Sequence, residues 1–380
     1  MQEFDLTDFR ARPLPDEQTI MSGWQGDVAR PVVSVICTTF NHQSYLDDTI
    51  RGFLLQKTGF PFEIVIHDDA STDVTQTIIK GYAARYPNLI RPVLQTENQF
   101  SQGKKPMPLA ASHARGEYLA LCEGDDFWVD QGKLTSQHAA LVAHPDCKLC
   151  FHPAWHGGAH TAPDVFERVR NDNLFYPSCA CVLPAGMIIA GAGNFIPTAS
   201  IFLKKSVMDT LPDWFGACPV GDYFIQSLGA VPAGAVFLPA PMCCYRVDAA
   251  GSWSQDHKAM HDKKVRHWAR MRPSIAAMGK YLGKPWQPDI RFVQRNADEF
   301  LLGDRDIPVQ VRVQAYQDYA RATPGLVIHL MMALRHVPGV LKLLVLLPYK
   351  ARIARLCYLG RIKLIKDIGC AMKPPVGKSA

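Results

Sequence analysis

Short apolar segments alternate with helical patterns from Pro31 onward, and this alternation constrains the fold more than any other feature of the chain. The apolar segments are rich in β-branched residues, and the first four cover residues 32–40, 62–67, 90–95 and 118–122. Helical patterns separate the first three, at about 45–56 and 73–85. Strands that are apolar throughout are typical of a parallel sheet covered on both faces. The pattern therefore predicts an α/β fold with a doubly wound, mostly parallel sheet and helices on both faces.

The pattern is weaker beyond residue 134. We expect a helix up to about Ala143, a strand at 148–152 and a loop-rich stretch over 153–197. Two further strands are expected at 199–203 and 235–245, and the chain has helical character from about residue 257. We therefore divide it into an N-terminal extension (1–30), a main domain (31–256) and a helical, basic and amphipathic C-terminal region (257–380).

Two features predict a cytoplasmic protein. The first 30 residues contain acidic side chains throughout and no apolar run, so they do not resemble a secretory signal. The cysteine count of 11 is odd, and Cys243 and Cys244 are adjacent. Neither property is typical of a disulfide framework, which favours a reducing compartment.

Positive charge is concentrated at the C-terminal end. Residues 331–380 contain ten Lys or Arg and one acidic residue, Asp367, so the rest of the chain is slightly acidic within the total of +6. Leucine and isoleucine alternate with these basic residues, which is typical of a segment lying on a membrane surface. The charges interrupt any run of the roughly 20 apolar residues that a membrane crossing needs. The alternative is a helix packed on the main domain with a solvated basic face.

Acidic residues follow two of the predicted strands, where ligands bind in open α/β sheets. The second strand leads into residues 68–73 (DDASTD), and the fourth leads into residues 123–126 (EGDD). Carboxylates crowded at one edge of a sheet repel each other unless a cation compensates them. Oxygen ligands suit Mg²⁺ or Mn²⁺, which often bind one or two carboxylates together with substrate phosphates. Two alternatives stay open: Ser71 or Asp73 caps the next helix, and residues 123–126 form an ordinary turn.

Other site types have weaker support. The chain has no glycine-rich phosphate loop of the Walker or dinucleotide type, which argues against ATP and NAD binding. A nucleotidyltransferase that makes activated sugars would need a glycine-rich, basic loop after the first strand, and residues 39–42 (TFNH) do not supply one. Cys147 and Cys150, with His152 and His156 nearby, have zinc-like spacing, but a second cysteine pair is missing.

Five stretches, in this order and spacing, resemble the family 2 glycosyltransferases with a GT-A fold, in particular the bacterial members that build surface polysaccharides. The resemblance extends from Pro31 to about Ser254. The stretches are residues 33–42 (VSVICTTFNH), 68–73 (DDASTD), 114–128 (ARGEYLALCEGDDFW), 221–223 (GDY) and 245–246 (YR).

The resemblance implies a role for several residues. Thr38 and Phe40 would line the base pocket of the nucleotide together with Asp69, which matches the family's uracil-side carboxylate. Residues 123–126 match the family's DxD motif, whose acids hold the ribose and the metal-bound diphosphate. Glu123 departs from that motif at its first position, and Asp125 and Asp126 are the metal candidates.

Asp222 stands at the position of the family's catalytic base. The chemistry of inversion independently requires such a group, since a carboxylate opposite the leaving diphosphate must take the proton of the attacking hydroxyl. The alternative for Asp222 is a helix N-cap.

Arg246 is a candidate for contact with the diphosphate, because a guanidinium matches phosphate oxygens; a surface ion pair is the alternative. Relatives often have a histidine two positions after this arginine, where this chain has Asp248. Trp253 is a candidate for a mobile lid over the donor or for the core, and Trp155 and His156 are candidates for the border of the acceptor cleft.

These features together predict an inverting, metal-dependent (Mn²⁺ or Mg²⁺) glycosyltransferase, of the hexosyltransferase type, that moves a sugar from a nucleotide-sugar, most simply a UDP-sugar, to a hydroxyl. The expected acceptor is a glycan or a lipid-linked glycan of the bacterial cell envelope, with residues 331–380 on the inner face of the membrane. A catalytically degenerate nucleotide-sugar-binding or scaffold protein is the non-enzymatic alternative. Nucleic acid is not an expected partner, because stacking aromatics are few in the basic tail.

Overall fold

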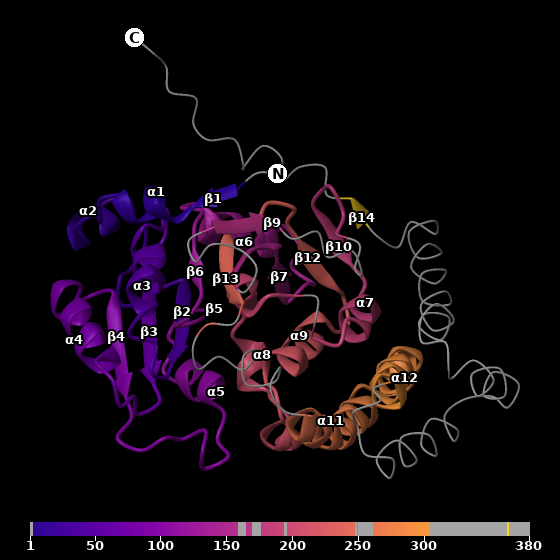
Figure 1. Ribbon diagram of the computed structural model, residues 1–380. Helices are drawn as coiled ribbons and strands as arrows, with labels where there is room; N and C mark the ends of the chain where they lie inside the picture. Colours follow the sequence, from indigo (N-terminus) through magenta and orange to yellow (C-terminus); the bar gives the residue numbers. More distant parts are fainter. Residues whose placement is uncertain are drawn as a thin grey trace, which may run out of the picture.

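The computed structural model describes residues 3–158, 165–168, 176–193, 196–247, 249, 261–303 and 363–364 (Figure 1). It confirms the predicted alternation of strands and helices in the first part of the main domain. The elements there are β2 (Val33–Thr39), α3 (Leu46–Leu54), β3 (Phe62–Asp68), α4 (Thr75–Arg85), β4 (Ile90–Leu94), α5 (Pro106–Ala111) and β5 (Tyr118–Glu123).

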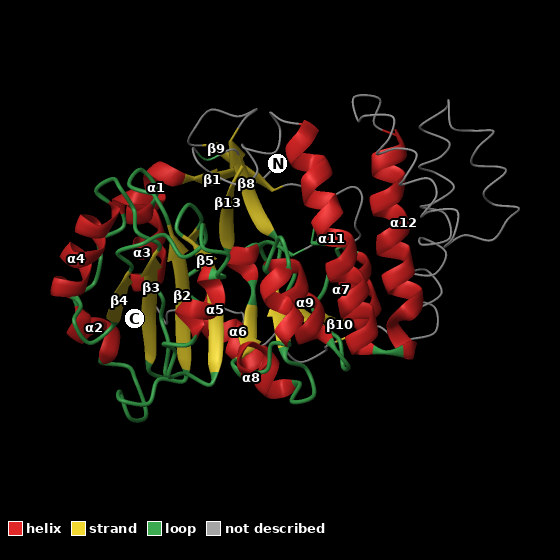
Figure 2. Cartoon of the chain, turned by 90° about the horizontal axis from the view of Figure 1, so that it is seen from below, coloured by secondary structure: helices red, strands yellow, loops and turns green. Residues whose placement is uncertain are grey.

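These strands belong to a nine-stranded sheet with the order β14-β10-β12-β7-β11-β5-β2-β3-β4. The four strands from β5 to β4 are parallel, whereas β11 (Phe202–Lys204) runs antiparallel between β5 and β7 (Leu149–Phe151). Successive side chains of β2 enter different cores, as a strand covered on both faces requires. Val35 and Cys37 pack with α3 and α6 (Lys133–Ala143), and Ile36 packs with α5, α7 (Ala185–Ala190) and α9 (Asp222–Ala230). The sheet is therefore mixed, with helices on both faces (Figure 2).

A second sheet lies beside the first and was not predicted. It has five strands in the order β1-β9-β8-β13-β6, and it joins segments that are far apart in the sequence. Its members are β1 (Glu3–Asp5), β9 (Val165–Arg168), β8 (Ala154–Gly158), β13 (Cys243–Val247) and β6 (Phe127–Trp128). The N-terminal residues thus form part of the fold, with helices α1 (Leu6–Ala11) and α2 (Glu17–Met21) after β1.

One prediction of secondary structure was wrong. The stretch 153–197, expected to be rich in loops, contains the short elements β8, β9, β10 (Cys181–Leu183) and α7 among its described residues. The single strand expected at 235–245 is two strands in different sheets, β12 (Ala235–Phe237) and β13. The division of 235–245 was missed because short strands pair with distant partners that a local pattern does not contain.

The helical character expected from residue 257 is confirmed as far as Gly303. Helix α11 (His261–Leu282) leads through η3 (Lys284–Trp286) into α12 (Gln287–Gly303), and both pack on the core that contains α7. The remaining elements are η1 (Thr198–Ser200), α8 (Ser206–Asp209), η2 (Asp213–Ala217) and β14 (Lys363–Leu364). No helix among the described residues is long and apolar enough to span a membrane. The basic tail 331–380 lies outside the described residues, apart from β14.

Candidate active site

The acidic ends of β3 and β5 lie on either side of the end of β2. In the sheet register, Thr39 is opposite Asp68 and Thr38 is opposite Glu123. The residues that follow are also hydrogen-bonded to β2: the Asp69 amide donates to the Thr39 carbonyl over 3.0 Å, and the Gly124 amide donates to the Thr38 carbonyl over 2.9 Å. The two acidic segments singled out in the sequence therefore meet at one edge of the sheet.

The segment after β3 is held by its own carboxylates. Asp68 is buried and accepts hydrogen bonds from the Ser71 amide over 3.0 Å and from Gln76 Nε2 over 2.7 Å. Asp73 accepts from the Thr75 amide over 2.9 Å at the start of α4. Asp69 reaches a different segment: its two carboxylate oxygens accept from the amides of Gln99 and Phe100, over 2.8 and 3.0 Å. Asp69 thus anchors the loop after β4 beside the expected base pocket.

Two aromatic rings are exposed near this pocket. Phe40 directly follows β2 and is 43% exposed, and Phe100 is 59% exposed next to the amides that Asp69 holds. Thr38 is partly buried at the end of β2. Asn41 has a φ of 55° and Ala70 a φ of 64°, in the left-handed region that residues other than glycine rarely adopt. Such backbone conformations concentrate at ligand sites, where the surrounding structure imposes them.

Residues 123–126, called the acidic loop below, bring three carboxyl groups together. Burial raises the pKa of Glu123 to about 8, with further contributions from Asp125 and Asp222. Burial, Asp125 and Glu123 also raise the pKa of Asp126 well above its ordinary value. Gly124 allows the close approach to β2, because a Cβ atom there would lie 2.6 Å from Thr39 Oγ1.

The acidic loop fits a divalent cation that has few protein ligands. Asp126 Oδ1 accepts from the Arg246 amide over 2.9 Å, whereas its Oδ2 is buried without a hydrogen-bond partner among the described residues. Burial and the neighbouring carboxylates raise the pKa of Glu123 and Asp126, and Arg246 opposes the shift of Asp126 only in part. No group of three or more His, Cys, Asp or Glu in the described ranges is arranged to hold a metal alone. A Mg²⁺ or Mn²⁺ ion would therefore need substrate oxygens in addition to one or two of these carboxylates.

Asp222 is the first residue of α9. Gly221, not Asp222, occupies the N-cap position, and no side-chain capping bond is formed there. Burial raises the pKa of Asp222, which the backbone amides at the start of the helix and Lys105 partly oppose. Since Asp222 contributes to the raised pKa of Glu123, it belongs to the same electrostatic neighbourhood as the acidic loop. Lys105 was missed by sequence reasoning, because no motif distinguishes it from its neighbour Lys104.

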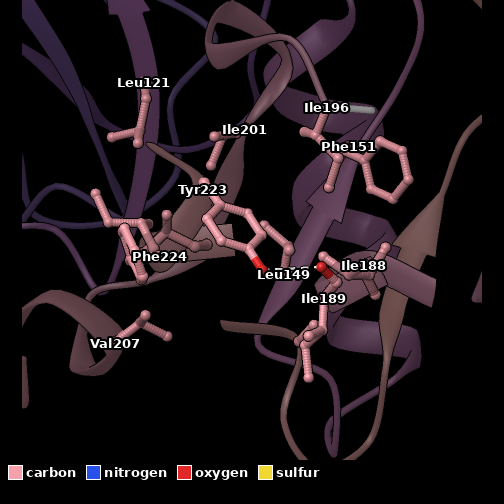
Figure 3. Close-up of a cluster of buried hydrophobic side chains, with 14 of the residues drawn as sticks. Leu121, Leu149, Phe151, Ile188, Ile189, Ile196, Ile201, Val207, Tyr223 and Phe224 are labelled. Atoms are coloured by element: carbon pink, nitrogen blue, oxygen red, sulfur yellow. Dashed lines mark hydrogen bonds between the residues drawn. The ribbon is translucent and has the colours of Figure 1, made fainter. Parts of the chain in front are cut away.

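Tyr223 fixes the start of α9 from the core side. Its side chain is 1% exposed, and its hydroxyl donates to the Ile189 carbonyl of α7 over 2.9 Å (Figure 3). The ring packs among apolar side chains from β5, β7 and α7, which include Leu121, Leu149 and Ile188. Asp222 is thus attached to a rigid helix end rather than to a mobile loop.

Arg246 lies in β13 and contacts the protein with several of its donors. Its Nη1 donates to the Asp125 carbonyl over 2.6 Å, and its Nη2 donates to Asp48 Oδ2 over 2.5 Å. Its guanidinium carbon lies 4.4 Å from the centroid of the Phe127 ring. Asp48 was not predicted as a site residue, because it has the appearance of a surface acid in the first turn of a helix.

The remaining candidates are two cysteines, two residues of β8 and two residues that the structure does not describe. Cys147 and Cys150 are buried free thiols and form no metal cluster within the described residues. Trp155 and His156 lie on β8, where His156 packs against Tyr245 with ring centroids 5.5 Å apart. Asp248 and Trp253 lie outside the described residues.

Comparisons with known proteins agree with this architecture. Residues 34–180 match the family model Glycosyl transferase family 2. The Mycobacterium tuberculosis protein Rv1520 is 36% identical over 247 residues, which cover 64% of this chain and 66%, just under two thirds, of Rv1520. The Staphylococcus aureus poly(ribitol-phosphate) beta-N-acetylglucosaminyltransferase TarS is 34% identical over 97 residues, which cover 25% of this chain and 16% of TarS.

A solved structure shares the fold at low sequence identity. The crystal structure of S. aureus TarS 1–349 in complex with UDP-GlcNAc matches with a TM-score of 0.55 and 17% identity. The match covers 82% of this chain and 87% of that one. The family match and the shared architecture lead to one conclusion: residues 34–180 match glycosyl transferase family 2, within a chain that has the GT-A fold.

Proposed function

We propose that this protein is an inverting, metal-dependent glycosyltransferase that moves a sugar from a UDP-sugar to a hydroxyl group. One observation carries the proposal: buried carboxyl groups at the end of β5 and at the start of α9 share a neighbourhood. Burial raises the pKa of Glu123, Asp126 and Asp222, and repulsion from neighbouring carboxylates adds to the shifts of Glu123 and Asp126. A site of this kind favours binding of a cation together with a diphosphate. The likeness to TarS, whose structure holds UDP-GlcNAc, supports a UDP-sugar as the donor.

The acidic loop is assigned to the diphosphate side of the donor. Asp125, with Asp126 behind it, would hold Mn²⁺ or Mg²⁺, and Glu123 would contact the ribose. When bound, the metal neutralises the charge that develops on the leaving diphosphate. Thr38, Phe40 and Asp69 would form the base pocket, in which the exposed ring of Phe40 gives a stacking surface. Arg246 already donates to Asp48 and Asp125, which favours a positioning role over direct contact with phosphate.

Asp222 is assigned to the acceptor side as the general base. As the hydroxyl attacks the anomeric carbon and the bond to the diphosphate breaks, the carboxylate takes the hydroxyl proton. The raised pKa of Asp222 makes it a stronger base than an ordinary aspartate, and a base is most effective when its pKa approaches the working pH. The ammonium of Lys105 helps to keep Asp222 ionised.

The acceptor is proposed to be a cell-envelope glycan or a lipid-linked glycan, and the protein is proposed to work in the cytoplasm. A lipid-linked acceptor would account for the basic, leucine-rich tail, which would hold the enzyme at the inner membrane face. Mutation tests the tail separately from the chemistry: replacement of the six Lys and Arg residues in 331–361 by Gln keeps β14, and it should reduce binding to anionic vesicles and leave hydrolysis of a soluble donor unchanged.

Two substitutions test the chemistry. The purified protein is incubated with Mn²⁺ and a panel of nucleotide-sugars, and release of the nucleotide is measured. We expect Asp125→Asn to abolish turnover and weaken nucleotide binding, and Asp222→Asn to stop transfer while binding persists. Asp47→Asn is the control, because Asp47 pairs with Tyr82 on α4 and not with the acidic loop. Full activity of either test variant would contradict its assigned role, and wild-type binding without turnover would favour a degenerate binding protein.

A further inference from the structure

We propose that Arg10 and Asp48 are positioning residues for the acidic loop, which makes the N-terminal segment part of the catalytic unit. Arg10 lies on α1, before the first residue, 34, that the family model matches. The assignment of a substrate to this loop rests on the proposed function, but the positioning itself is independent of it.

The backbone of the acidic loop is held by two side chains, Thr49 and Arg246. Thr49 Oγ1, on α3, lies 2.9 Å from the Gly124 carbonyl and 2.6 Å from the Asp126 carbonyl, and its one hydroxyl proton is donated to one acceptor at a time. Arg246 holds the carbonyl between them, that of Asp125, over 2.6 Å. The two side chains together restrict the backbone of the residue whose carboxylate would bind the metal. Of the two, Arg246 is charged, so its charge needs a compensating partner.

Asp48 compensates Arg246 and is shared with Arg10. Asp48 Oδ2 accepts from Arg246 Nη2 over 2.5 Å and from Arg10 Nη2 over 2.8 Å, and Oδ1 accepts from Arg10 Nε over 2.9 Å. The side chain of Asp48 is 3% exposed, and that of Arg246 is 10% exposed. A two-pronged guanidinium–carboxylate pair is strong and directional, and an unpaired buried charge would be costly. Loss of the Asp48 charge should therefore displace Arg246 and release the Asp125 carbonyl.

The N-terminal segment is fixed strongly enough to place Arg10. Phe9 of α1 is fully buried, and its ring centroid lies 5.1 Å from that of Phe127, which directly follows the acidic loop. β1 pairs antiparallel with β9 in the second sheet. Figures 1 and 2 both show α1 beside α3, which carries Asp48. Arg10 thus reaches the loop through one shared carboxylate.

The test compares each variant with a matched control. Asp48→Asn is compared with Asp47→Asn, since Asp47 is adjacent on α3 but pairs with Tyr82. Arg10→Met is compared with Arg30→Met, since the side chain of Arg30 is 89% exposed and its ion pair is with Asp27, not with Asp48. Thermal unfolding of each variant verifies that it folds.

Amide hydrogen exchange in peptides covering residues 121–129 is the first readout. We expect faster exchange in Asp48→Asn and Arg10→Met and wild-type exchange in the two controls. Calorimetric titration with UDP and Mn²⁺ is the second. Asp48→Asn should weaken binding about 10- to 100-fold, as substitutions behind a metal ligand do, and Arg10→Met about two- to fivefold, because Arg10 is half exposed.

A double variant supplies the decisive comparison. If Arg10 acts through Asp48, Arg10→Met should have no further effect in the Asp48→Asn background. Unchanged exchange in Asp48→Asn, or equal effects of Asp47→Asn and Asp48→Asn, would overturn the positioning role. If the wild-type protein fails to bind UDP with Mn²⁺, the proposed function fails, and the exchange data still decide whether the loop is positioned in this way.

Discussion

Replacement of Lys133 by methionine should change how the stability of the protein depends on pH. Lys133 begins α6 and is fully buried, with its Nζ 3.9 Å from the centroid of the Trp128 ring and 2.7 Å from Gln137 Oε1. Burial lowers the pKa of Lys133 from 10.5 to about 8, although Cys243, Cys122, Cys150 and Asp130 oppose the shift. The folded protein therefore binds this proton more weakly than the unfolded chain does.

The sign follows from the difference in bound protons. Between pH 8 and 10.5 the unfolded chain holds a proton on Lys133 that the folded protein has lost, so the free energy of unfolding rises with pH. A shift from 10.5 to about 8 corresponds to about 3 kcal/mol. From pH 7.5 to 9.5, the wild type should gain about 2 kcal/mol relative to Lys133→Met. At pH 7.5 the variant removes this penalty but leaves Gln137 Oε1 unpaired, at a cost of about 1–3 kcal/mol, so the two proteins should have similar stability there.

Urea unfolding followed by far-ultraviolet circular dichroism measures both proteins at pH 7.5 and 9.5. The comparison between proteins is essential, because buried cysteines with raised pKa values, such as Cys37 and Cys243, make stability fall with pH in both. That contribution cancels in the difference between wild type and variant. A difference in unfolding free energy that stays constant between the two pH values would refute a buried, weakly basic Lys133.

Three further predictions concern the surroundings of the site. Gly52→Ala should destabilise the fold by about 1–3 kcal/mol, because the new Cβ atom would lie 2.6 Å from the Trp128 carbonyl oxygen. Gly81→Ala, on α4, should stabilise the fold by up to about 1 kcal/mol, because no atom lies within 4 Å of the new Cβ atom. Urea unfolding compares the two variants. Tyr223→Phe removes the hydrogen bond from the tyrosine hydroxyl to the Ile189 carbonyl, which still accepts from the Ala192 amide over 3.3 Å. The loss should cost about 0.5–1.5 kcal/mol, measured by the same assay, and wild-type stability would show that this bond contributes nothing. Burial raises the pKa of Asp222, so kcat/KM should fall as the pH decreases through a midpoint above the ordinary value of 3.8. A pH–rate profile measures this midpoint, and a value at or below 3.8 would argue against Asp222 as the base.

Local sequence patterns predicted the first half of the main domain well. Strands β2 to β5 and helices α3 and α4 follow from apolar runs and helical spacing, because strands that are buried on both faces of a parallel sheet are apolar throughout. Helix α5, between β4 and β5, was not predicted. The same patterns placed residues 68–73 and 123–126 at strand ends, and strand ends of a parallel sheet meet at one edge. The sequence alone was therefore enough to predict that Asp69 and the acidic loop both lie beside the end of β2.

The second sheet was not predictable in this way. Its strands are short, and each pairs with a partner that is distant in the chain: β1 with β9, and β13 with both β6 and β8. A short strand has too few residues to show a clear alternation of apolar and polar side chains, and its stability comes from packing and pairing that only the folded chain provides. For the same reason the N-terminal residues 3–12 looked like an extension although they belong to the fold.

The amino-acid order thus contains the chemistry of the site, in the form of acidic residues after buried strands and a separate acid at residue 222. Only the tertiary structure decides which charged side chains pair with one another. Asp48 and Arg246 are 198 residues apart, and Arg10 and Asp48 are 38 apart, yet the three form one hydrogen-bonded chain behind the acidic loop. A charged side chain has the same appearance in the sequence whether water or another charge surrounds it, because its environment depends on residues that folding brings close.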